Sequence, residues 1–269
     1  MVRQTEFRCG YVAIVGRPNV GKSTLLNRLV GQKISITSRR PQTTRTNILG
    51  IRTTTDAQLI FIDTPGLDAP SEQALNRYMN RTACSVLDCV DVHLFVVEAQ
   101  AWRDEDRFVL DRLMQRGAPI VLAVNKIDAL PDKKQLLPYI AQLSGQADFA
   151  AVIPLSASKG DNVESLVTDL IGRMPCAAAL FPVDQVTDRS MRFVAAELIR
   201  EKLMRRLSAE VPYGLAIEID RFEELEGLAR IDAQIWVERP GQKAIVVGSG
   251  GRVLKEVGTQ VRLELERLL

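Results

Sequence analysis

The chain has 269 residues, of which 46% are hydrophobic and 25% are charged, and its formal net charge is +2. This composition is typical of a folded globular protein and excludes a disordered chain. The near-neutral charge excludes a global basic footprint for nucleic acid, so any RNA contact has to come from a local patch. Its apolar runs are much shorter than the ~20 residues that span a bilayer, and the N-terminus lacks the apolar stretch of a signal peptide. We therefore expect a cytoplasmic protein with one large domain or two small ones.

The histidine and cysteine content argues against several kinds of active site. His93 is the only histidine and lies in the apolar strand pattern DVHLFVVE, so we expect it to pack in the core. A Ser-His-Asp triad or a multi-histidine metal site is therefore disfavoured. The chain has four cysteines: Cys9, Cys84, Cys89 and Cys176. They form no CxxC pair and no metal-like spacing, which favours reduced thiols in a cytosolic protein.

The first part of the chain alternates short β-rich runs with helical patterns. The strand-like runs are YVAIVG, NILGIRT, AQLIFIDTPG, DVHLFVVE, APIVLAVNK and AAVIPLSAS. Helical spacing occurs between them, as in RDEDRFVLDRLMQRG and DNVESLVTDLIGRM. Repeated strand–helix units with nearly continuous apolar strands predict a mainly parallel sheet with helices on both faces. The short connection between NILGIRT and AQLIFID predicts one antiparallel edge strand. We expect this α/β domain to occupy residues 1–176.

The pattern changes after Pro175, where PCAAALFPVDQVTDRS has two prolines and no clear period. We interpret residues 177–190 as a linker. Next comes an amphipathic helical pattern, MRFVAAELIREKLMRRL, whose apolar face carries Val194, Leu198, Leu203 and Leu207. Strand patterns follow in YGLAIEIDRF and ARIDAQIWVER, and KAIVVGSGG then leads into a helical segment. Residues 191–269 are thus predicted to form a small α+β domain of order α-β-β-α.

The stretch GRPNVGKST completes the pattern GxxxxGK(S/T) between a predicted strand and a predicted helix. Gly16 and Gly21 allow a close backbone approach that a side chain would block. The loop amides and the helix N-terminus would face phosphate anions, with Lys22 reaching the terminal phosphates and Ser23 binding Mg²⁺. The predicted phosphate-binding loop comprises Gly16, Arg17, Pro18, Asn19, Val20, Gly21, Lys22, Ser23 and Thr24.

The stretch DTPG closes the buried strand pattern QLIFI. A DxxG pattern by itself is expected about once by chance in a chain of this length, but its position after a strand and downstream of the phosphate loop is informative. We expect Asp63 to hold Mg²⁺ from its outer coordination sphere and the amide of Gly66 to contact the γ-phosphate.

The stretch NKID follows the strand pattern PIVLAV and indicates the base. The Asp128 carboxylate can accept two hydrogen bonds from the N1–H and N2–H₂ edge of guanine, whereas adenine would leave it unpaired, a difference worth about 10⁴ in discrimination. Asn125 would link this loop to the phosphate loop, and the stem of Lys126 would cover the base. In the stretch SAS, Ser156 ends the last strand and the amide of Ala157 is placed to donate to guanine O6. The sequence therefore predicts a guanine-nucleotide site.

These four motifs together resemble those of the translation-factor-related small GTPases. The stretch ISITSRRPQTTRTNILGI, with FPVDQVTDRSMRF at the domain junction, resembles specifically the Era family of ribosome-assembly GTPases, from about Tyr11 to the last residue. The resemblance implies a P-loop GTPase domain followed by a KH domain of type II. It also implies that Thr44, with Thr43 as the alternative, is the Mg²⁺-binding threonine of the first switch.

By the same resemblance, the first switch runs from about Ile34 to Thr46 and the second from Leu67 to about Tyr78. Leu67 follows DTPG where Ras-like enzymes carry a water-orienting glutamine, and a leucine cannot orient water. We therefore expect slow intrinsic hydrolysis. Relatives with a hydrophobic residue here often use K⁺ held by a P-loop asparagine, so we hypothesise K⁺ at Asn19, with loop shaping as the alternative role of that residue. The expected catalytic group is Lys22, Thr44, Gly66 and Asn19.

The stretch VVGSGGRVLKEVG contains GxxG, read here as lying between a strand and a helix. By chance the pattern is as common as DxxG, but its context resembles the KH domain, where this loop clamps about four RNA nucleotides. A tight strand-to-helix turn is the alternative. The expected RNA-binding residues are Gly248, Ser249, Gly250, Gly251, Arg252 and Lys255.

Two features temper the RNA assignment. Residues 191–269 contain thirteen Lys/Arg and thirteen Asp/Glu, and positive charge is concentrated only in REKLMRR and the helix after GxxG. KH domains of this family continue beyond the segment matching VRLELERLL with a further strand and helix, whereas this sequence ends at Leu269. Either the sequence is a shortened piece of a longer chain or this version lacks the strand. In both cases we expect the KH domain as given to have an exposed sheet edge, weaker RNA affinity and lower stability than a longer relative.

The preferred function is a GTPase that couples its nucleotide state to KH-domain binding of RNA near the 3′ end of small-subunit rRNA, during small ribosomal subunit assembly. The family resemblance names this RNA, the small ribosomal subunit and a peripheral association with the cytoplasmic membrane, and we expect a monomer. The alternatives are an RNA-binding module that turns GTP over slowly, and a related GTPase of tRNA modification or large-subunit assembly. An ATP-driven kinase is disfavoured by NKID.

Overall fold

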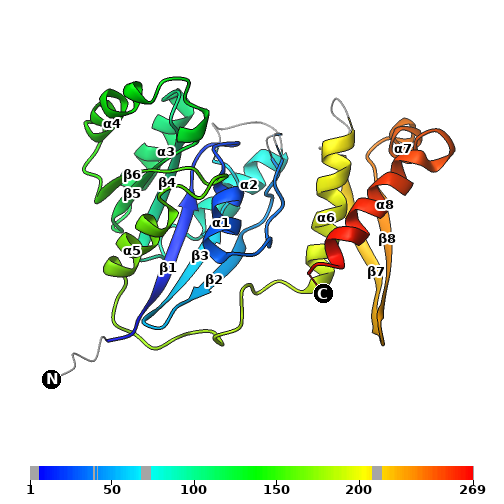
Figure 1. Cartoon of the computed structure of the whole chain (residues 1–269). Coiled ribbons are helices and arrows are strands. Elements are labelled where there is room, and N and C mark those ends of the chain that lie inside the picture. Colours follow the sequence, from blue (N-terminus) through cyan, green and yellow to red (C-terminus); the bar gives the residue numbers. More distant parts are fainter. Residues whose placement is uncertain (1–5, 39, 41, 68–73, 208–213, 269) are drawn as a thin grey trace. The chain divides into compact units, whose positions relative to one another are not determined.

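A computed structural model of the chain describes residues 6–38, 40, 42–67, 74–207 and 214–268. The chain forms two compact units. One unit consists of Met1–Ser35 together with Thr44–Asp188, and the other consists of Ile36–Thr43 together with Arg189–Leu269. The first contains the elements from β1 to α5 in Figure 1, and the second contains those from α6 to α8. Each unit has its own core and is described in turn.

The first unit is built on a six-stranded sheet of order β2-β3-β1-β4-β5-β6. Its strands are β1 (Arg8–Val15), β2 (Ile48–Thr53), β3 (Ala57–Asp63), β4 (Val92–Glu98), β5 (Ile120–Asn125) and β6 (Ala151–Pro154). They coincide with the six predicted strand runs. All neighbouring pairs are parallel except β2 and β3, which are antiparallel, with β2 at the edge. The predicted parallel sheet with one antiparallel edge strand is confirmed.

Helices cover both faces of this sheet (Figure 1). They are α1 (Lys22–Val30), α2 (Ala74–Cys84), α3 (Asp104–Met114), α4 (Leu136–Ser144) and α5 (Val163–Arg173), with short 3₁₀ turns at Ile127–Ala129 and Lys133–Gln135. Side chains of α2, α3 and α4 join one hydrophobic cluster with β1, β4 and β5. Helices α1 and α5 contact each other and the β1–β3 side of the sheet. Apolar strands buried on both faces follow from this double cover.

The core of the first unit lies on the central strands. Every residue of β3 is buried, and the largest fully buried side chains among the described residues are Phe61 on β3 and Phe95 on β4. His93 on β4 is also fully buried, and its Nε2 lies 2.9 Å from the carbonyl oxygen of Leu87. Burial lowers the pKa of His93, which favours the neutral imidazole. The interpretation of His93 as a core residue is confirmed.

The predicted linker contains no helix or strand, yet it is hydrogen-bonded to the sheet. Gln58, fully buried on β3, accepts hydrogen bonds from the amides of Leu180 and Phe181 at 2.8 and 3.0 Å. The Thr187 hydroxyl donates to the carbonyl of Leu49 on β2 at 2.7 Å. Residues of this segment up to Asp188 accordingly belong to the first unit. The buried Gln58 amide explains how an aperiodic, proline-containing stretch follows a defined course along the sheet.

The second unit has the order α6 (Met191–Arg206), β7 (Ala216–Leu225), β8 (Leu228–Trp236), α7 (Pro240–Val247) and α8 (Arg252–Leu265). One prediction was wrong here, because the apolar run before GSGG forms helix α7 and not a strand. The GxxG loop therefore lies between two helices. A short apolar run does not distinguish helix from strand by period. The helix is favoured by Pro240 in its first turn and by a hydrogen bond from the Arg239 amide to the Gln242 side chain at 3.1 Å.

The predicted apolar face of α6 is buried in the core of the second unit. Val194, Leu198 and Leu203 lie within the helix, and Leu207 lies just beyond its end. Alternate residues of the β7–β8 hairpin, such as Ile217 and Ile231, pack against this cluster together with the apolar side chains of α8. Half-buried strands with one packed face show this alternation.

Several sequence expectations concern thiols, metals and membranes. All four cysteines carry free thiols, with Cys9 buried and Cys89 and Cys176 exposed. Within the described ranges, no three His, Cys, Asp or Glu side chains are grouped so that they could hold a metal ion. No helix among the described residues has the length and apolar character that crossing a bilayer requires.

Candidate functional site

Four of the predicted motifs follow strands whose carboxyl ends meet at one edge of the sheet. The phosphate loop follows β1, Asp63 ends β3, Asn125 ends β5 and Ser156 follows β6. These strands are parallel and adjacent to one another or to β4, with Ile14 beside Asp63 in the register. In open α/β sheets this edge is where ligands bind. The topology thus brings together loops that are far apart in the sequence.

The phosphate loop curls around the ammonium group of Lys22. Its Nζ donates to the carbonyl oxygens of Gly16 and Arg17, each at 2.9 Å. A Cβ at Gly16 would overlap the carbonyl of Val96, and a Cβ at Gly21, whose φ is 101°, would overlap the side chain of Asn125. Both glycines are therefore required by close approach. Burial lowers the pKa of Lys22 to about 8, and the nearby Asp63 carboxylate offsets only part of that effect.

Hydroxyl groups from three segments converge on the Asp63 carboxylate. Its Oδ2 accepts hydrogen bonds from Ser23 at 2.7 Å, from Ser35 at 3.0 Å and from Thr44 at 3.5 Å, and the Ser23 and Thr44 hydroxyls lie 2.8 Å apart. Asp63 is fully buried, and its Oδ1 has no hydrogen-bond partner among the described residues. Burial raises the pKa of Asp63, although the Ser23 hydrogen bond and the Lys22 charge oppose the rise.

This cluster suits a hard divalent cation, which prefers oxygen ligands and compensates a buried carboxylate. Ser23, Asp63 and Thr44 are the three residues that the sequence analysis assigned to Mg²⁺, and the structure brings them together. Ser35 was missed as a site residue: it lies in the stretch ISITSRRPQTTRTNILGI, but the family resemblance assigned a Mg²⁺-binding role there only to a threonine. For Thr43, the alternative to Thr44, the hydroxyl instead donates to the carbonyl of Arg40 at 2.7 Å.

The segment after β3 packs closely against the phosphate loop. A Cβ on Gly66 would lie 2.8 Å from the backbone nitrogen of Pro18, and the Leu67 amide donates to the carbonyl of Gly16 at 3.2 Å. The Leu67 side chain is fully buried in the core and does not orient water. Residues 68–73 of the predicted second switch lie outside the described residues, and helix α2 begins at Ala74.

The base side of the site is held by Asn125. Its side-chain amide donates to the carbonyl of Val20 at 2.8 Å, which is the predicted link to the phosphate loop. Its Oδ1 accepts from the amide of Ala157 at 2.9 Å, so this structure engages the amide that we assigned to guanine O6. The exposed Asp128 carboxylate accepts from the hydroxyls of Ser156 at 2.5 Å and Ser158 at 3.1 Å. The Ser156 hydrogen bond is the main reason why the pKa of Asp128 is lowered, so it is ionised at neutral pH. Ser158 was not among the predicted site residues.

The second unit presents the GxxG loop between α7 and α8. Gly248, Gly250 and Gly251 all have positive φ, at 73°, 60° and 75°. A Cβ on Gly248 would lie 2.6 Å from the Val253 side chain, whereas nothing lies near Gly250 or Gly251. Open space in front of the N-terminus of a 14-residue helix permits the approach of a phosphate. Arg252 and Lys255 of α8 are exposed.

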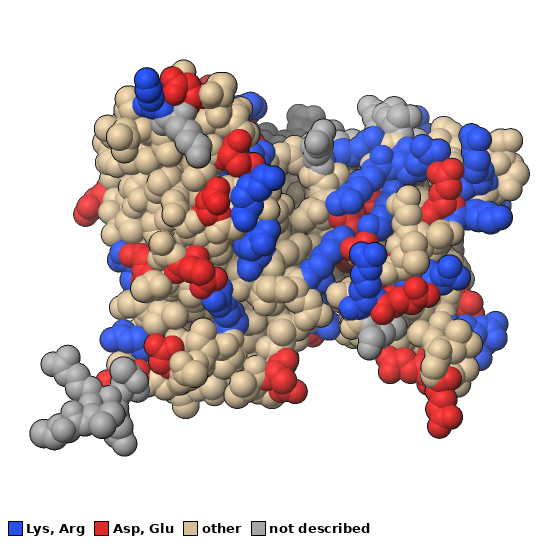
Figure 2. All heavy atoms as spheres, in the orientation of Figure 1, with Lys and Arg blue, Asp and Glu red and all other residues tan. Residues whose placement is uncertain are grey.

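Charge is unevenly distributed over the second unit. Figure 2 shows its Lys and Arg side chains gathered mainly on the upper part in this view, with Asp and Glu prominent toward the lower end. Residues 191–269 have equal numbers of basic and acidic side chains, yet this uneven distribution still gives a local basic surface.

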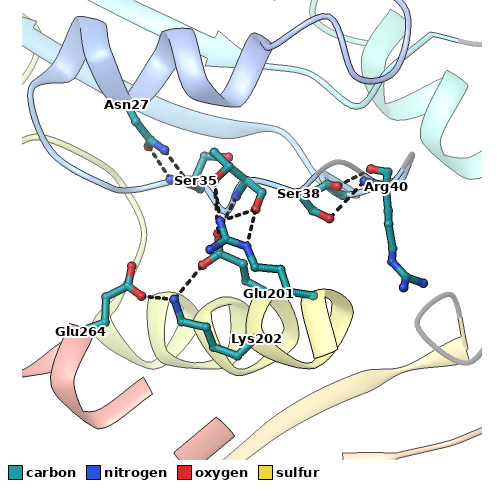
Figure 3. Close-up of polar contacts among 10 residues, drawn as sticks. Asn27, Ser35, Ser38, Arg40, Glu201, Lys202 and Glu264 are labelled. Carbon is teal, nitrogen blue, oxygen red and sulfur yellow. Dashed lines mark hydrogen bonds and ion pairs between the residues drawn. The ribbon is translucent and has the colours of Figure 1, made fainter. Parts of the chain in front are cut away.

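The second unit also includes a segment that the sequence analysis placed in the first switch. The buried Glu201 carboxylate of α6 accepts hydrogen bonds from the amide and hydroxyl of Thr37 at 3.0 and 3.3 Å, and it pairs with Arg205 at 2.6 Å (Figure 3). Lys202 bridges Glu201 and Glu264. These contacts explain why residues 36–43 belong to this unit and not to the one that contains Ser35 and Thr44. The local sequence did not predict that residues 36–43 would belong to the second unit.

Comparisons with known proteins agree with these two units. A family model described as 50S ribosome-binding GTPase matches residues 11–126, and a KH domain model matches residues 210–269. The GTPase Era of Azotobacter vinelandii is 52% identical over 268 residues, covering 100% of this chain and 89% of the relative. That of Stenotrophomonas maltophilia strain K279a is 53% identical, covering 100% and 90%. The chain belongs to the Era family of GTPases.

Two solved Era structures match nearly the whole of this chain. Era in complex with MgGDPNP and nucleotides 1506–1542 of 16S ribosomal RNA has a TM-score of 0.93 and 38% identity, over 97% of this chain and 89% of that one. A variant of Aquifex aeolicus Era bound to GDP·AlF₄⁻ also has a TM-score of 0.93, with 37% identity, over 97% and 90%. This Era-family chain is therefore a P-loop GTPase with a C-terminal KH domain.

Proposed function

We propose that this chain binds and hydrolyses GTP and couples its nucleotide state to binding of the 3′ end of small-subunit rRNA through the KH domain, in small ribosomal subunit assembly. The observation that carries the proposal is the convergence of phosphate loop, hydroxyl–carboxylate cluster and base loop at one edge of the sheet. The RNA partner is supported by the related Era structure that contains nucleotides 1506–1542 of 16S ribosomal RNA.

In this proposal the phosphate loop and the amides at the start of α1 bind the phosphates, and Lys22 neutralises their charge. Ser23 and Thr44 would hold Mg²⁺ with Asp63 behind them, and the ion supplies charge neutralisation at the phosphates when bound. The Gly66 amide, held against Pro18, would contact the γ-phosphate.

Guanine selectivity is assigned to Asp128, with Asn125 positioning the loop and the stem of Lys126 covering the base. The test is calorimetric binding of GDP and ADP to the wild type, to Asp128→Asn and to Asp132→Asn. Asp132 is a matched control, since it is another exposed aspartate four residues further on. We expect a preference for GDP of about 10⁴ that Asp128→Asn abolishes and Asp132→Asn retains. Equal binding of ADP by the wild type would refute the assignment.

Hydrolysis separates this proposal from an RNA-binding module with GTP as a passive ligand. We expect multiple-turnover release of phosphate from GTP that is slow but clearly above a Lys22→Ala control. We also propose that K⁺ at the exposed Asn19 contributes to catalysis, because Leu67 is buried in the core and supplies no polar group. Equal kcat in K⁺ and Na⁺ would refute the K⁺ proposal, and Asn19 would then serve only to shape the loop.

RNA binding is assigned to Gly248, Ser249, Gly250, Gly251, Arg252 and Lys255. The test is fluorescence anisotropy with an oligonucleotide matching the 3′ end of 16S rRNA. Gly250→Asp places a negative charge in the loop, and Gly227→Asp is the control, because both glycines have positive φ and open surroundings. We expect only Gly250→Asp to weaken binding, and tighter binding with a GTP analogue than with GDP.

We propose that the chain acts in the cytoplasm with the ribosome, and that it is a monomer. Peripheral association with the cytoplasmic membrane, which the family resemblance implies, is proposed as a second location. Cell fractionation followed by immunodetection tests both, and co-sedimentation with ribosomal small subunits in the presence of a GTP analogue tests the partner directly.

A further inference from the structure

A carboxylate that belongs to none of the motifs lies between the phosphate loop and the base loop. Glu98 is the last residue of β4, whose register places it beside Asn125 of β5. One of its oxygens is 2.5 Å from the Arg17 guanidinium, and the other pairs with the ammonium of Lys126. The side chain is 17% exposed. The Tyr139 hydroxyl donates to the Glu98 carbonyl at 3.0 Å and helps to anchor the strand end.

The Arg17 side of this arrangement is rigid. Arg17 is almost completely buried, and its Nε donates to Asp106 at 3.1 Å. Asp106 is fully buried and accepts a hydrogen bond from the Arg103 amide at 3.0 Å, which caps helix α3. Arg17 is therefore held by two carboxylates, Asp106 and Glu98, and in turn it holds the Glu98 carboxylate in place.

The Lys126 side of this arrangement is more exposed to solvent than the Arg17 side. Lys126 is only partly buried, its φ is 66°, and its Nζ also donates to the carbonyl of Asn19 at 2.7 Å. Burial alone would raise the pKa of Glu98, but the hydrogen bonds from Lys126 and Arg17 outweigh burial and lower it. An ionised Glu98, together with the Asn19 carbonyl, thus holds the end of the Lys126 side chain, which reaches from the base loop to the phosphate loop.

We propose that Glu98 is a positioning residue for nucleotide binding, which holds the ammonium of Lys126 so that the lysine stem lies over the guanine base. This inference rests on the proposed role of Lys126 in covering the base. Glu98 acts on the base and not on the transferred phosphate. Its loss is therefore expected to raise the KM for GTP and the Kd for GDP while kcat is retained.

The test is a double-mutant cycle with Glu98→Gln, Lys126→Met and the combined variant, with Kd for GDP measured by calorimetry. We expect Glu98→Gln to weaken binding about fivefold to tenfold, and to have no further effect in the Lys126→Met background. In GTP turnover, kcat is expected to stay within about twofold of the wild type while KM rises. Asp106→Asn is the matched control, since it removes the other carboxylate of Arg17 without touching Lys126, and its effect is expected to be additive with Lys126→Met.

The outcomes separate two failures. If Lys126→Met binds GDP like the wild type, the proposed role of Lys126 in base binding is wrong. If Lys126→Met weakens binding but Glu98→Gln weakens it further by the same factor in both backgrounds, the positioning role of Glu98 is overturned. A fall in kcat that matches the fall in kcat/KM also overturns it, because Glu98 would then act through the phosphate loop. Glu98→Asp, which keeps the charge on a shorter side chain, takes the place of the glutamine variant if that variant does not fold.

Discussion

The buried Lys22 makes nucleotide affinity depend on pH in a defined direction. In the nucleotide-free chain, burial lowers its pKa from 10.5 to about 8. That change corresponds to roughly 3 kcal/mol against the charged form. Bound phosphates would restore the charge and raise the pKa again. Binding should therefore take up a proton above about pH 8, and affinity should fall as the pH rises through that value.

The size of the effect follows from the fraction of Lys22 that is charged. Between about pH 7 and about pH 8.5 we expect the Kd for GDP to rise about fourfold. Proton uptake should grow from about a tenth of a proton to about three quarters of a proton. Isothermal titration calorimetry in buffers of different ionisation enthalpy measures both quantities. Staying at or below about pH 8.5 also keeps the guanine base of GDP mostly un-ionised, so the change in Kd reports on Lys22.

The control is Lys22→Arg, since a guanidinium keeps its proton throughout this range. Its Kd for GDP should change much less between the two pH values, and its proton uptake should be near zero. A wild-type Kd that stays constant, or an arginine variant with the same pH dependence as the wild type, would refute the reasoning. The free energy of unfolding of the nucleotide-free chain should rise with pH between about pH 8 and 10.5, because the unfolded chain binds more protons than the folded chain in that range.

Three further predictions concern single side chains. Gly66→Ala should weaken binding of a GTP analogue more than that of GDP, because the added Cβ would push against the Pro18 backbone at 2.8 Å; equal weakening in titrations would contradict this. Phe61→Ala should lower the free energy of unfolding of the first unit by about 3–5 kcal/mol in denaturant titrations, since the ring is fully buried, and a loss below about 1 kcal/mol would show that the core relaxes around the cavity. Glu201→Gln should destabilise the second unit by about 1–3 kcal/mol and speed amide exchange at Thr37, because the buried carboxylate loses its charge while Lys202 keeps its pair with Glu264; unchanged exchange would contradict the role of Glu201 in holding residues 36–43.

Much of the nucleotide site could be predicted because its chemistry is local in the sequence. Gly16, Lys22 and Ser23 lie within a few residues of one another, and a strand-to-helix turn brings them together whatever surrounds it. The parallel order of the strands then places Asp63 and Asn125 at the same edge. The close approach predicted at Gly16 and Gly21 is also present, since an added Cβ at either position would overlap atoms that are distant in the sequence.

The residues that were missed depend on long-range packing. No motif assigned a role to Ser35 or Glu98, because their partners Asp63 and Lys126 are distant in the sequence and come close only on folding. The conformation of α7 was misread because an apolar run as short as AIVV fits either the helical or the strand period until a neighbouring layer selects one.

By itself, the sequence determined the element types of the first unit, its parallel sheet and the residues proposed to bind a guanine nucleotide, because hydrophobic period and motif spacing are local properties. Only the tertiary structure decided that residues 36–43 join the second unit and that Glu98 pairs with Arg17 and Lys126. The physical reason is that a buried charge pairs with whichever opposite charge lies close to it in space. When the partners lie on separate strands and helices, their distance in the sequence does not tell which of them are close.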